Sequence, residues 1–309
     1  MEKKVLLVVD GSIHSTHAIT YAVRISSVVK DLSYTLFHVQ PTLSRYLLDE
    51  AEHNLKSKAA LKKVIRKNAE HARQILEQHK DRMVLMGIDE TRIETATQKK
   101  VMGIAKDILD RGQRGLYDAI IVGRRGLSRL QQTFMGSTTS QLVEHSRLIP
   151  VWVVDGDVES MKVMLAVDGS EASLRAVDHF SFMVGGNEDL KVTVFHVTPM
   201  LRNYCAIDFD DKESGAGKVI ARGARRCVDH FYAHARKKFT DAGLRDDQVE
   251  LEVVKRSVDV GKAIVGRIRK EDYGTVVLGR RGTGEAFFMG SVSKYVLDKT
   301  YGRTLWVVS

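Results

Sequence analysis

A short glycine-spaced stretch occurs twice in this chain, at corresponding places. The first copy is Gly123-Arg124-Arg125-Gly126, followed after nine residues by Gly136-Ser137; the second is Gly279-Arg280-Arg281-Gly282, followed after seven residues by Gly290-Ser291. Each copy stands between an apolar run typical of a strand and an amphipathic run typical of a helix. In an open parallel sheet, this position brings backbone N–H groups and a helix N-terminus to a bound anion. The stretch therefore predicts a wound parallel sheet with an anion site at its edge.

The repeat extends well beyond these glycines. Three stretches return in the second half in the same order: residues 5–12 as 163–170, residues 37–39 as 195–197, and residues 151–154 as 305–308. A period of about 155 residues is too long for a solenoid unit and matches a whole domain. We therefore expect two similar domains, over residues 1–156 and 161–309, joined by a short polar connector that cannot hold them far apart.

Short apolar runs alternate with longer helical patterns in both halves, which predicts an α/β fold. In the first half we expect strands near residues 4–10, 33–39, 92–97, 119–122 and 150–154, and helices near 15–29, 49–80, 102–111 and 138–145. In the second half we expect strands near 162–168, 191–197, 249–254, 275–278 and 304–308, and helices near 172–184, 216–240, 260–269 and 292–298. Each half then forms a doubly wound, five-stranded parallel sheet.

The composition is that of a soluble globular protein. Hydrophobic residues make up 43% and charged residues 28% of the chain, with only 3 prolines. No apolar run approaches the roughly 18 residues of a membrane span, and the sequence enters its first strand without the apolar region of a signal peptide. We expect a cytoplasmic protein. Cys205 and Cys227 have no counterparts in the other half and are expected to be free thiols.

The chain is basic, with a net charge of +9 and a pI near 9.4. Its basic residues are spread over helices such as residues 56–80 among glutamate and histidine, rather than gathered in a stripe with aromatic residues. This pattern disfavours a nucleic-acid partner. The charge is better explained as a surface that receives small polyanions.

Both halves resemble the universal stress protein family, and together they cover essentially the whole chain. The ATP-binding pattern of that family is GxxGx9G[ST], which residues 123–137 satisfy in full, whereas residues 279–291 have seven intervening residues instead of nine. The opening Val-Asp-Gly-Ser after the first strand, present in both copies, strengthens the match. The resemblance implies the Rossmann-like fold of the adenine nucleotide alpha hydrolases. It also implies binding of ATP or AMP, although other subgroups bind no nucleotide.

The first glycine loop offers a cradle for phosphates. Gly123 and Gly126 are expected to turn with positive φ and to let the backbone approach a ligand. Gly136 and Ser137 open a helix whose unpaired N–H groups favour negative charge. We expect hydroxyl hydrogen bonds from Ser137 and Thr138, and Ser137 is also expected to be the N-cap of the helix. The matching residues of the second half are Gly279, Gly282, Gly290 and Ser291.

Asp10, at the carboxyl end of the first strand, can accept hydrogen bonds from a ribose or hold a Mg²⁺. The alternative is a cap of the turn that follows, because Asp-Gly-Ser is turn chemistry. The resemblance implies that Asp10 lies beside the nucleoside, that the main chain of Val39 pairs with adenine and that Val122 lines the site. Both valines would be core residues without a ligand. The counterparts in the second half are Asp168 and Val197.

Arg124 and Arg125 are candidates for gripping phosphate oxygens, the alternative being solvated loop arginines. Arg280 and Arg281 repeat them in the second half. The second loop is shorter, and Thr283-Gly284-Glu285 places a carboxylate where phosphates would pass. That charge opposes a triphosphate unless a cation bridges it. We therefore expect ATP, AMP or ADP mainly in the first domain.

Other arrangements of reactive residues are weaker. His230 and His234 stand one helical turn apart, but no third metal ligand is evident, and a surface pair is the simpler interpretation. His38 and His196 recur at equivalent strand positions, which indicates a shared packing or crevice role. No nucleophile arrangement is present, and the first site offers no base for water apart from Asp10. We expect no metal site and no catalytic residue.

The terminal strands predict how the halves assemble. Trp152 and Trp306 lie in these strands, each followed by two valines, and an unpaired apolar edge of this kind is an aggregation hazard. The resemblance implies pairing through such strands. We expect the strand 5 edges of the two domains to pair inside one chain, giving a pseudo-twofold unit that is able to form a homodimer.

Three functions remain open from the sequence. The first is an ATP-binding stress regulator whose nucleotide state biases a conformation or a surface for an unidentified protein partner. The second is an enzyme, either a slow ATPase or a phosphotransferase. The third is a stress scaffold that binds no nucleotide.

Overall fold

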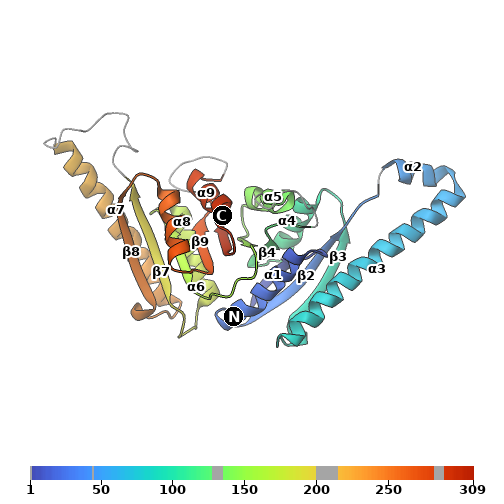
Figure 1. The fold of residues 1–309 in the computed structure, drawn as a ribbon, viewed down its shortest axis with the longest axis horizontal. Coiled ribbons are helices and arrows are strands. Elements are labelled where there is room, and N and C mark those ends of the chain that lie inside the picture. Colours follow the sequence, from blue (N-terminus) through green and yellow to red (C-terminus); the bar gives the residue numbers. More distant parts are fainter. Residues whose placement is uncertain (1, 44, 127–134, 200–214, 282–288) are drawn as a thin grey trace. The chain divides into compact units, whose positions relative to one another are not determined.

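The computed structural model describes the chain except for residues 1, 44, 127–134, 200–214 and 282–288 (Figure 1). The chain forms two compact units, and each is described by itself. Unit 1 comprises Met1–Val23 and Asp31–Asp155, and unit 2 comprises Arg24–Lys30 and Gly156–Ser309. The expected pairing of the strand 5 edges concerns both units together and stays a prediction.

Unit 1 is built from alternating strands and helices. In chain order they are β1 (Lys3–Val8), α1 (Ile13–Arg24), β2 (Leu32–Gln40), α2 (Arg45–His53), α3 (Leu55–Leu85), the 3-10 turn η2 (Glu90–Arg92), β3 (Ile93–Lys99), α4 (Ile104–Arg114), β4 (Ala119–Gly123), α5 (Ser137–His145) and β5 (Val151–Val154). The five strands are parallel and lie in the order β3-β2-β1-β4-β5. The chain thus starts in the middle of the sheet and winds outward to each edge in turn, as a doubly wound sheet requires.

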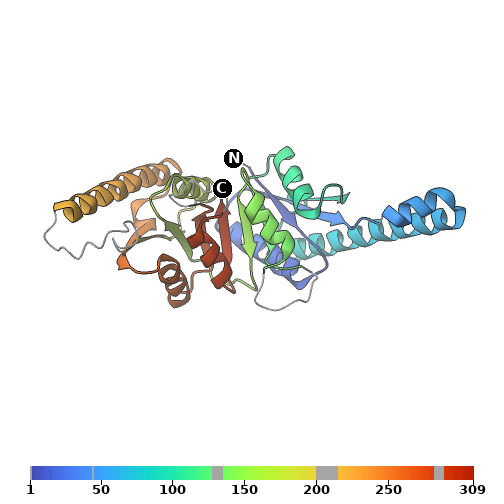
Figure 2. The same ribbon diagram turned by 90° about the horizontal axis from the view of Figure 1, so that it is seen from above.

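The middle strands of unit 1 are buried because helices cover both faces of the sheet (Figures 1 and 2). Val5, Leu6 and Leu7 of β1 are 0% exposed, and so are Ile120 and Ile121 of β4. Burial on both faces explains why these runs are continuously apolar, since a strand with one wet face would alternate apolar and polar residues.

The single helix expected over residues 49–80 is in fact two helices, so this prediction is wrong at Asn54. Asn54 separates α2 from α3 and has an extended conformation, with φ −135° and ψ 116°. Its side-chain Oδ1 accepts hydrogen bonds from the N–H groups of Lys56 and Ser57, at 2.9 and 3.4 Å. Asn54 is therefore the N-cap of α3, a role in which asparagine is strongly favoured.

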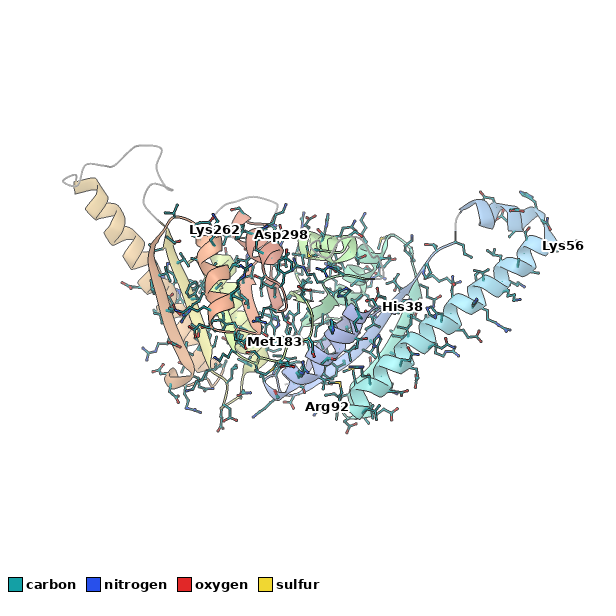
Figure 3. All side chains as sticks on the ribbon, in the orientation of Figure 1. His38, Lys56, Arg92, Met183, Lys262 and Asp298 are labelled. Carbon is teal, nitrogen blue, oxygen red and sulfur yellow. The ribbon has the colours of Figure 1, made fainter. Side chains whose placement is uncertain are left out.

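Helix α3 has 31 residues, and only its second half packs on the sheet. Its buried side chains are those of Ala72, Ile75, Leu76, His79 and Met83. The first half extends beyond the sheet together with α2 (Figures 1 and 2), and Figure 3 shows Lys56 at this outer end. The attachment of α3 to the sheet therefore depends on its C-terminal half.

Unit 2 repeats this architecture. Its elements are the 3-10 turn η1 (Ile25–Ser27), β6 (Val163–Val167), α6 (Glu171–Val184), β7 (Val192–Pro199), α7 (Gly215–Asp241), the 3-10 turn η4 (Asp246–Gln248), β8 (Val249–Ser257), α8 (Val260–Lys270), β9 (Thr275–Gly279), α9 (Ser291–Lys299) and β10 (Thr304–Val308). The parallel strands lie in the order β8-β7-β6-β9-β10. The predicted fold class is thus confirmed in both units. None of the helices in the described ranges is both long enough and apolar enough to cross a membrane.

Replacing Asn54 by alanine is expected to loosen the start of α3. The substitution removes the side-chain acceptor of the Lys56 and Ser57 N–H groups, which costs about 1 kcal/mol at a helix N-cap. Hydrogen exchange at the first-turn amides of α3 should therefore become about fivefold faster. Asn68→Ala, inside the same helix, is the control and should leave those amides unchanged; equal exchange in both variants would contradict the cap.

Candidate functional site

Asp10 caps the turn between β1 and α1. Its Oδ1 accepts hydrogen bonds from the Ser12 N–H at 3.0 Å and from the Ser15 hydroxyl at 2.7 Å. The Ser15 hydroxyl in turn accepts a hydrogen bond from the Asp10 N–H at 2.8 Å. Asp10 therefore has the capping role that the sequence left as the alternative, and both hydrogen bonds that its carboxylate accepts in this turn go to Oδ1.

The second oxygen of Asp10 lies against the glycine loop. A Cβ placed on Gly126 would come within 2.8 Å of Asp10 Oδ2. Gly126 is therefore needed for close approach, and the carboxyl end of β1 meets the loop that follows β4. This juxtaposition leaves Asp10 able to cap its own turn through Oδ1 and to contact a ligand at the loop through Oδ2.

Gly123 is also required by close approach, but to the protein rather than to a ligand. A Cβ on Gly123 would lie 2.7 Å from the carbonyl oxygen and 2.8 Å from the carbonyl carbon of His14, in the first turn of α1. Neither Gly123 nor Gly126 has a positive φ. The prediction that these glycines turn through the left-handed region is therefore wrong.

The loop returns to the sheet at Gly136, where α5 begins. The Gly136 N–H donates to the carbonyl of Arg124 at 2.9 Å, and the Arg124 N–H donates to the carbonyl of Val154 in β5 at 2.8 Å. Gly136 is itself the N-cap, without a side-chain hydrogen bond, and Ser137 is the first helical residue. The prediction that Ser137 caps the helix is therefore wrong, and the N-cap supplies no side-chain acceptor for the first-turn N–H groups. Such groups attract an anion.

The first turn of α5 places three hydroxyl groups differently. Ser137 is exposed and Thr138 is half-buried, so their hydroxyls face space that a ligand can share. Thr139 is buried, and its hydroxyl donates to the Gly123 carbonyl at 2.9 Å. Thr139 was not predicted as a site residue. Its hydrogen bond fixes the start of α5 to the end of β4.

The two valines of the predicted nucleoside site are buried strand residues. Val122 in β4 pairs with Val8 of β1, which is the last residue of that strand. Val8 also pairs with Phe37 of β2, so Val39 lies beyond the end of β1 along the longer β2. Val39 and Val122 are 8% and 6% exposed. A ligand would therefore meet the main chain of Val39 rather than its side chain.

The loop arginines differ in exposure. The side chain of Arg124 is fully buried and that of Arg280 nearly so, whereas Arg125 and Arg281 are partly exposed. A phosphate contact by Arg124 or Arg280 stays a prediction. By exposure alone, Arg125 is better placed for such a contact.

Unit 2 repeats this network residue by residue. Asp168 Oδ1 accepts from the Ser170 N–H at 2.9 Å and from the Ser173 hydroxyl at 2.7 Å. The Ser293 hydroxyl donates to the Gly279 carbonyl at 2.7 Å, as Thr139 does to Gly123. The Gly290 N–H donates to the Arg280 carbonyl at 2.9 Å, as the Gly136 N–H does to Arg124. Gly290 is the N-cap of α9, and Ser291 is its first helical residue. Val197, the counterpart of Val39, is buried in β7.

The predicted differences between the two glycine loops concern partly residues outside the described ranges. Gly282 and the stretch Thr283-Gly284-Glu285 lie outside the described residues. The described parts differ around the aspartate: Asp10 is half-buried whereas Asp168 is exposed, and a histidine follows in the first copy where the second has alanine. The surroundings of the aspartate are therefore more enclosed in unit 1 than in unit 2.

The family of this chain follows from its sequence over nearly its whole length. Residues 1–155 and 159–301 match the model of the Universal stress protein family. The chain belongs to the universal stress protein family.

Individual relatives are more distant. A universal stress protein from Mycolicibacterium smegmatis is 28% identical over 203 residues, which are 63% of this chain and 64% of that protein, so somewhat less than two thirds of its length is matched. The crystal structure of a universal stress protein from Archaeoglobus fulgidus has a TM-score of 0.65 at 20% identity and covers 99% of this chain and 98% of its own. A protein of unknown function from Pseudomonas aeruginosa has a TM-score of 0.59 at 16% identity, covering 99% and 92%. At these identities the two structures support the fold alone.

The recurring histidines of this universal stress protein hold the ends of the central strands. His38 donates from Nδ1 to the Val9 carbonyl at 2.8 Å, and His196 donates to the Val167 carbonyl at 3.1 Å. His79, from α3, donates to the Asp10 carbonyl at 3.3 Å. Burial lowers the pKa of His79 and of His196 below the ordinary value of 6.5. The imidazoles of His79 and His196 are therefore neutral at pH 7, and their hydrogen bonds hold the carboxyl ends of the strands in place.

Two further predictions about reactive side chains concern unit 2. The rings of His230 and His234 lie 4.4 Å apart on α7. Within the described part of the chain, no three His, Cys, Asp or Glu side chains gather as metal ligands. Cys205 lies outside the described residues, and so does the side chain of Cys227.

Several site residues escaped the sequence reasoning although a signal for them exists. Ser15 returns as Ser173, and Thr139 returns as the hydroxyl residue Ser293, at the spacing of the surrounding repeats. Matching every hydroxyl residue between the copies would have found both pairs. His14 has no such signal, because Ala172 stands at its place in unit 2.

Stability of this universal stress protein is expected to fall as the pH drops below about 6.5. The unfolded chain binds protons at His79 and His196 near pH 6.5, whereas burial opposes their protonation in the folded chain, so stability present above pH 6.5 is lost on acidification. Urea unfolding at pH 7.5 and 5.5 should show a lower midpoint at pH 5.5. His196→Gln should reduce this difference and the exposed-residue control His71→Gln should not; equal differences in all three proteins would contradict the assignment.

Adding a single methyl group at Gly123 is expected to destabilise unit 1. The new Cβ would overlap the main chain of His14, which cannot move without displacing α1, and overpacking of this kind costs roughly 1–3 kcal/mol. Gly123→Ala should therefore lower the thermal midpoint. Gly266→Ala in α8 is the matched control, because nothing lies within 4 Å of a Cβ there. A midpoint of Gly123→Ala as high as that of the control would contradict the close approach.

Proposed function

We propose that this universal stress protein binds an adenine nucleotide, chiefly ATP, in the crevice of unit 1 at the carboxyl ends of β1 and β4. The observation that carries the proposal is that Asp10 Oδ2 lies where a side chain on Gly126 would stand, while α5 begins at Gly136 without a side-chain cap. A carboxylate, a glycine without a side chain and the N–H groups of a helix start are thus the groups proposed to meet a ligand. Doubly wound sheets bind their ligands in this crevice.

The phosphates would lie between Gly126 and the first turn of α5. The N–H groups of that turn and the helix dipole favour negative charge. The hydroxyls of Ser137 and Thr138 add donors at the same place. Gly136, which a Cβ would bring within 3.3 Å of the Arg125 Cα, keeps the helix start close to the loop. The helix can therefore approach the phosphates together with the loop.

The nucleoside would lie across the ends of β1 and β2. Asp10 Oδ2 can accept a hydrogen bond from a ribose hydroxyl, while Oδ1 stays occupied by the turn. The main chain of Val39, beyond the end of β1, is the candidate partner of adenine. A carboxylate beside phosphates is repulsive in a site of low dielectric, so Mg²⁺ bridging Asp10 and the phosphates would strengthen binding of the triphosphate.

The crevice of unit 2 is proposed as the weaker site. It carries the same framework of Asp168, Gly279 and Gly290, but its aspartate is exposed. Its loop is two residues shorter and carries Glu285, which opposes a triphosphate. One nucleotide per chain is the expected stoichiometry.

Regulation by bound nucleotide fits the site better than turnover does. Asp10 Oδ1 is used by the turn, and His38 and His79 each donate to a strand-end carbonyl. A general base must reach a water beside the phosphates, and in the proposed site the remaining oxygen of Asp10 is assigned to the ribose or to Mg²⁺. We infer a regulator whose nucleotide state is read by a partner.

One residue favours slow ATP hydrolysis as a second candidate function. His14 lies near Asp10 and Arg125, and among the described residues its Nδ1 has no hydrogen-bond partner. Burial, and then the charge of Arg125, lower its pKa, so the imidazole is neutral at pH 7 and able to accept a proton. The equivalent residue of unit 2 is Ala172, which makes His14→Ala a natural test.

ATP is expected to stabilise the protein against heat, and Gly126→Val should abolish most of this effect. ATP at about 100 times its dissociation constant adds roughly 2.7 kcal/mol to the stability of the state that binds it. Valine at position 126 places carbon where Asp10 Oδ2 meets the loop, so affinity measured by calorimetry should fall at least about tenfold. Gly266→Ala should bind ATP as the wild type does. An unaltered affinity in Gly126→Val, or no effect of ATP on the wild type, would refute the proposed site.

The two candidate functions differ in the fate of the bound ATP. A regulator should retain ATP unchanged through long incubation with Mg²⁺, as chromatography of the released nucleotide would show. If ADP accumulates and His14→Ala stops its formation without reducing ATP affinity, the enzyme is the correct alternative. Accumulation that persists in His14→Ala would exclude His14 as the base.

A further inference from the structure

Unit 2 contains a groove that lies apart from its glycine loop. It is lined by residues of helix α7, of strands β7 and β8, and of the turn between α7 and β8. Figure 1 shows α7 beside these two strands. Its volume is about 430 Å³, and most of its lining is apolar: Val194, Ala235, Phe239, Leu244, Val249 and Leu251. Small-molecule sites commonly have volumes of about 300–1,000 Å³ with mainly apolar walls. The groove therefore has the size and the surface of a ligand site.

The strand registers show where the sheet wall of this groove differs from unit 1. In unit 2, Val194 of β7 pairs with Leu251 of β8, and His196 pairs with Val253. In unit 1, Leu36 of β2 pairs with Thr95 of β3, and His38 pairs with Thr97. Because His38 and His196 are equivalent, Leu251 and Val253 occupy the places of the two threonines.

These apolar residues are exposed at the edge of a sheet. Leu251 is 49% exposed and Val253 is 38% exposed, on the outermost strand of unit 2. Exposed apolar side chains on an edge strand invite aggregation, and the same fold accepts threonine at both places in unit 1. The fold therefore does not require them. Leu251 lines the groove, and Val253 follows it on the same face of β8, so a molecule bound in the groove would explain the leucine.

The rim of the groove is charged but balanced. Arg236 donates to both carboxylate oxygens of Asp246, with 2.9 Å from Nε to Oδ1. Arg245 pairs with Asp247, with 3.0 Å from Nε to Oδ1. Each guanidinium at the groove thus already has a carboxylate partner. An anion would have to break such a pair and would also meet Asp229, and moving any charge from water against the mainly apolar walls is costly, so the groove favours an uncharged molecule.

Tyr232 adds a polar group to this wall. It lines the groove from α7, and its hydroxyl oxygen is buried without a hydrogen-bond partner among the described residues. Burial raises the pKa of this phenol, so the hydroxyl remains protonated and able to donate. A buried donor without a partner is unfavourable, and a ligand oxygen would satisfy it.

We propose that the groove between α7 and β8 binds an uncharged, mainly apolar small molecule with one hydroxyl or carbonyl group, such as a medium-chain alcohol. The apolar part covers Leu251 and Phe239, and the oxygen accepts a hydrogen bond from Tyr232. This site is separate from the nucleotide crevice. Binding there does not depend on whether ATP binds in unit 1.

The uncharged fluorescent probe N-phenyl-1-naphthylamine tests the proposal on the full chain. Its fluorescence should rise on binding, 1-decanol should displace it, decanoate should displace it much less well, and saturating ATP should not displace it. The double variant Leu251→Thr/Val253→Thr, which copies unit 1, should bind the probe about tenfold more weakly. Tyr232→Phe should weaken displacement by 1-decanol about fivefold.

The control is Glu250→Thr, on the same strand but pointing to the opposite face. It should bind the probe as the wild type does, and circular dichroism should be the same for every variant. The proposal is overturned if the wild type does not bind the probe, if the double variant binds it equally well, or if decanoate displaces it as readily as 1-decanol. Loss of ATP binding alone would refute the nucleotide site and leave this groove untouched.

Discussion

The structure depends on one close approach, in which the end of the fourth strand of each unit meets the first turn of the unit's first helix with no room for a side chain. In unit 1 the main chain of His14 fills the space beside Gly123, and in unit 2 Ala172 lies in the same way beside Gly279. The hydroxyl of Thr139 or Ser293 then binds the glycine carbonyl. The first helix and the helix after the fourth strand are thus both fixed to the end of that strand. The glycine loop that follows the strand therefore leaves the sheet beside the aspartate of the first strand.

The two units share the same strand-end hydrogen bonds but differ in the residues around the aspartate and at the sheet edge. Around the aspartate, unit 1 is the more enclosed and has His14, whereas unit 2 is open and has alanine. At the sheet edge the contrast is reversed, since β3 of unit 1 presents Thr95 and Thr97 where β8 presents leucine and valine. Duplication thus kept the interior hydrogen bonds and allowed the two exposed surfaces to diverge. Such divergence is expected where a core is shared and function resides in residues grafted onto it.

The sequence predicted the alternation of strands and helices, the doubly wound fold class and the repeat, because continuous apolar runs and repeated spacings report burial directly. Prediction from the sequence failed where one residue type is compatible with several structural roles. Glycine signals positive φ and close approach equally, and only the position of the His14 main chain shows which applies to Gly123. The break at Asn54 was hidden because charged and apolar residues continue in helical spacing on both sides of it. The cap at Gly136 was missed because serine is the stronger capping residue, whereas the Arg124 carbonyl determines where α5 begins.

The requirement at Gly123 also bears on how such motifs are interpreted in other members of the lineage. If the glycine is held by the neighbouring helix, purifying selection on folding alone preserves it after a duplicated copy has ceased to bind anything. Gly279 shows the same steric demand. An intact first glycine therefore indicates common descent and a requirement of folding, and is not by itself evidence of ligand binding. Loss of ligand binding in a duplicated domain would instead be marked by substitution of glycines such as Gly126, where an added Cβ would meet a side chain and not the main chain.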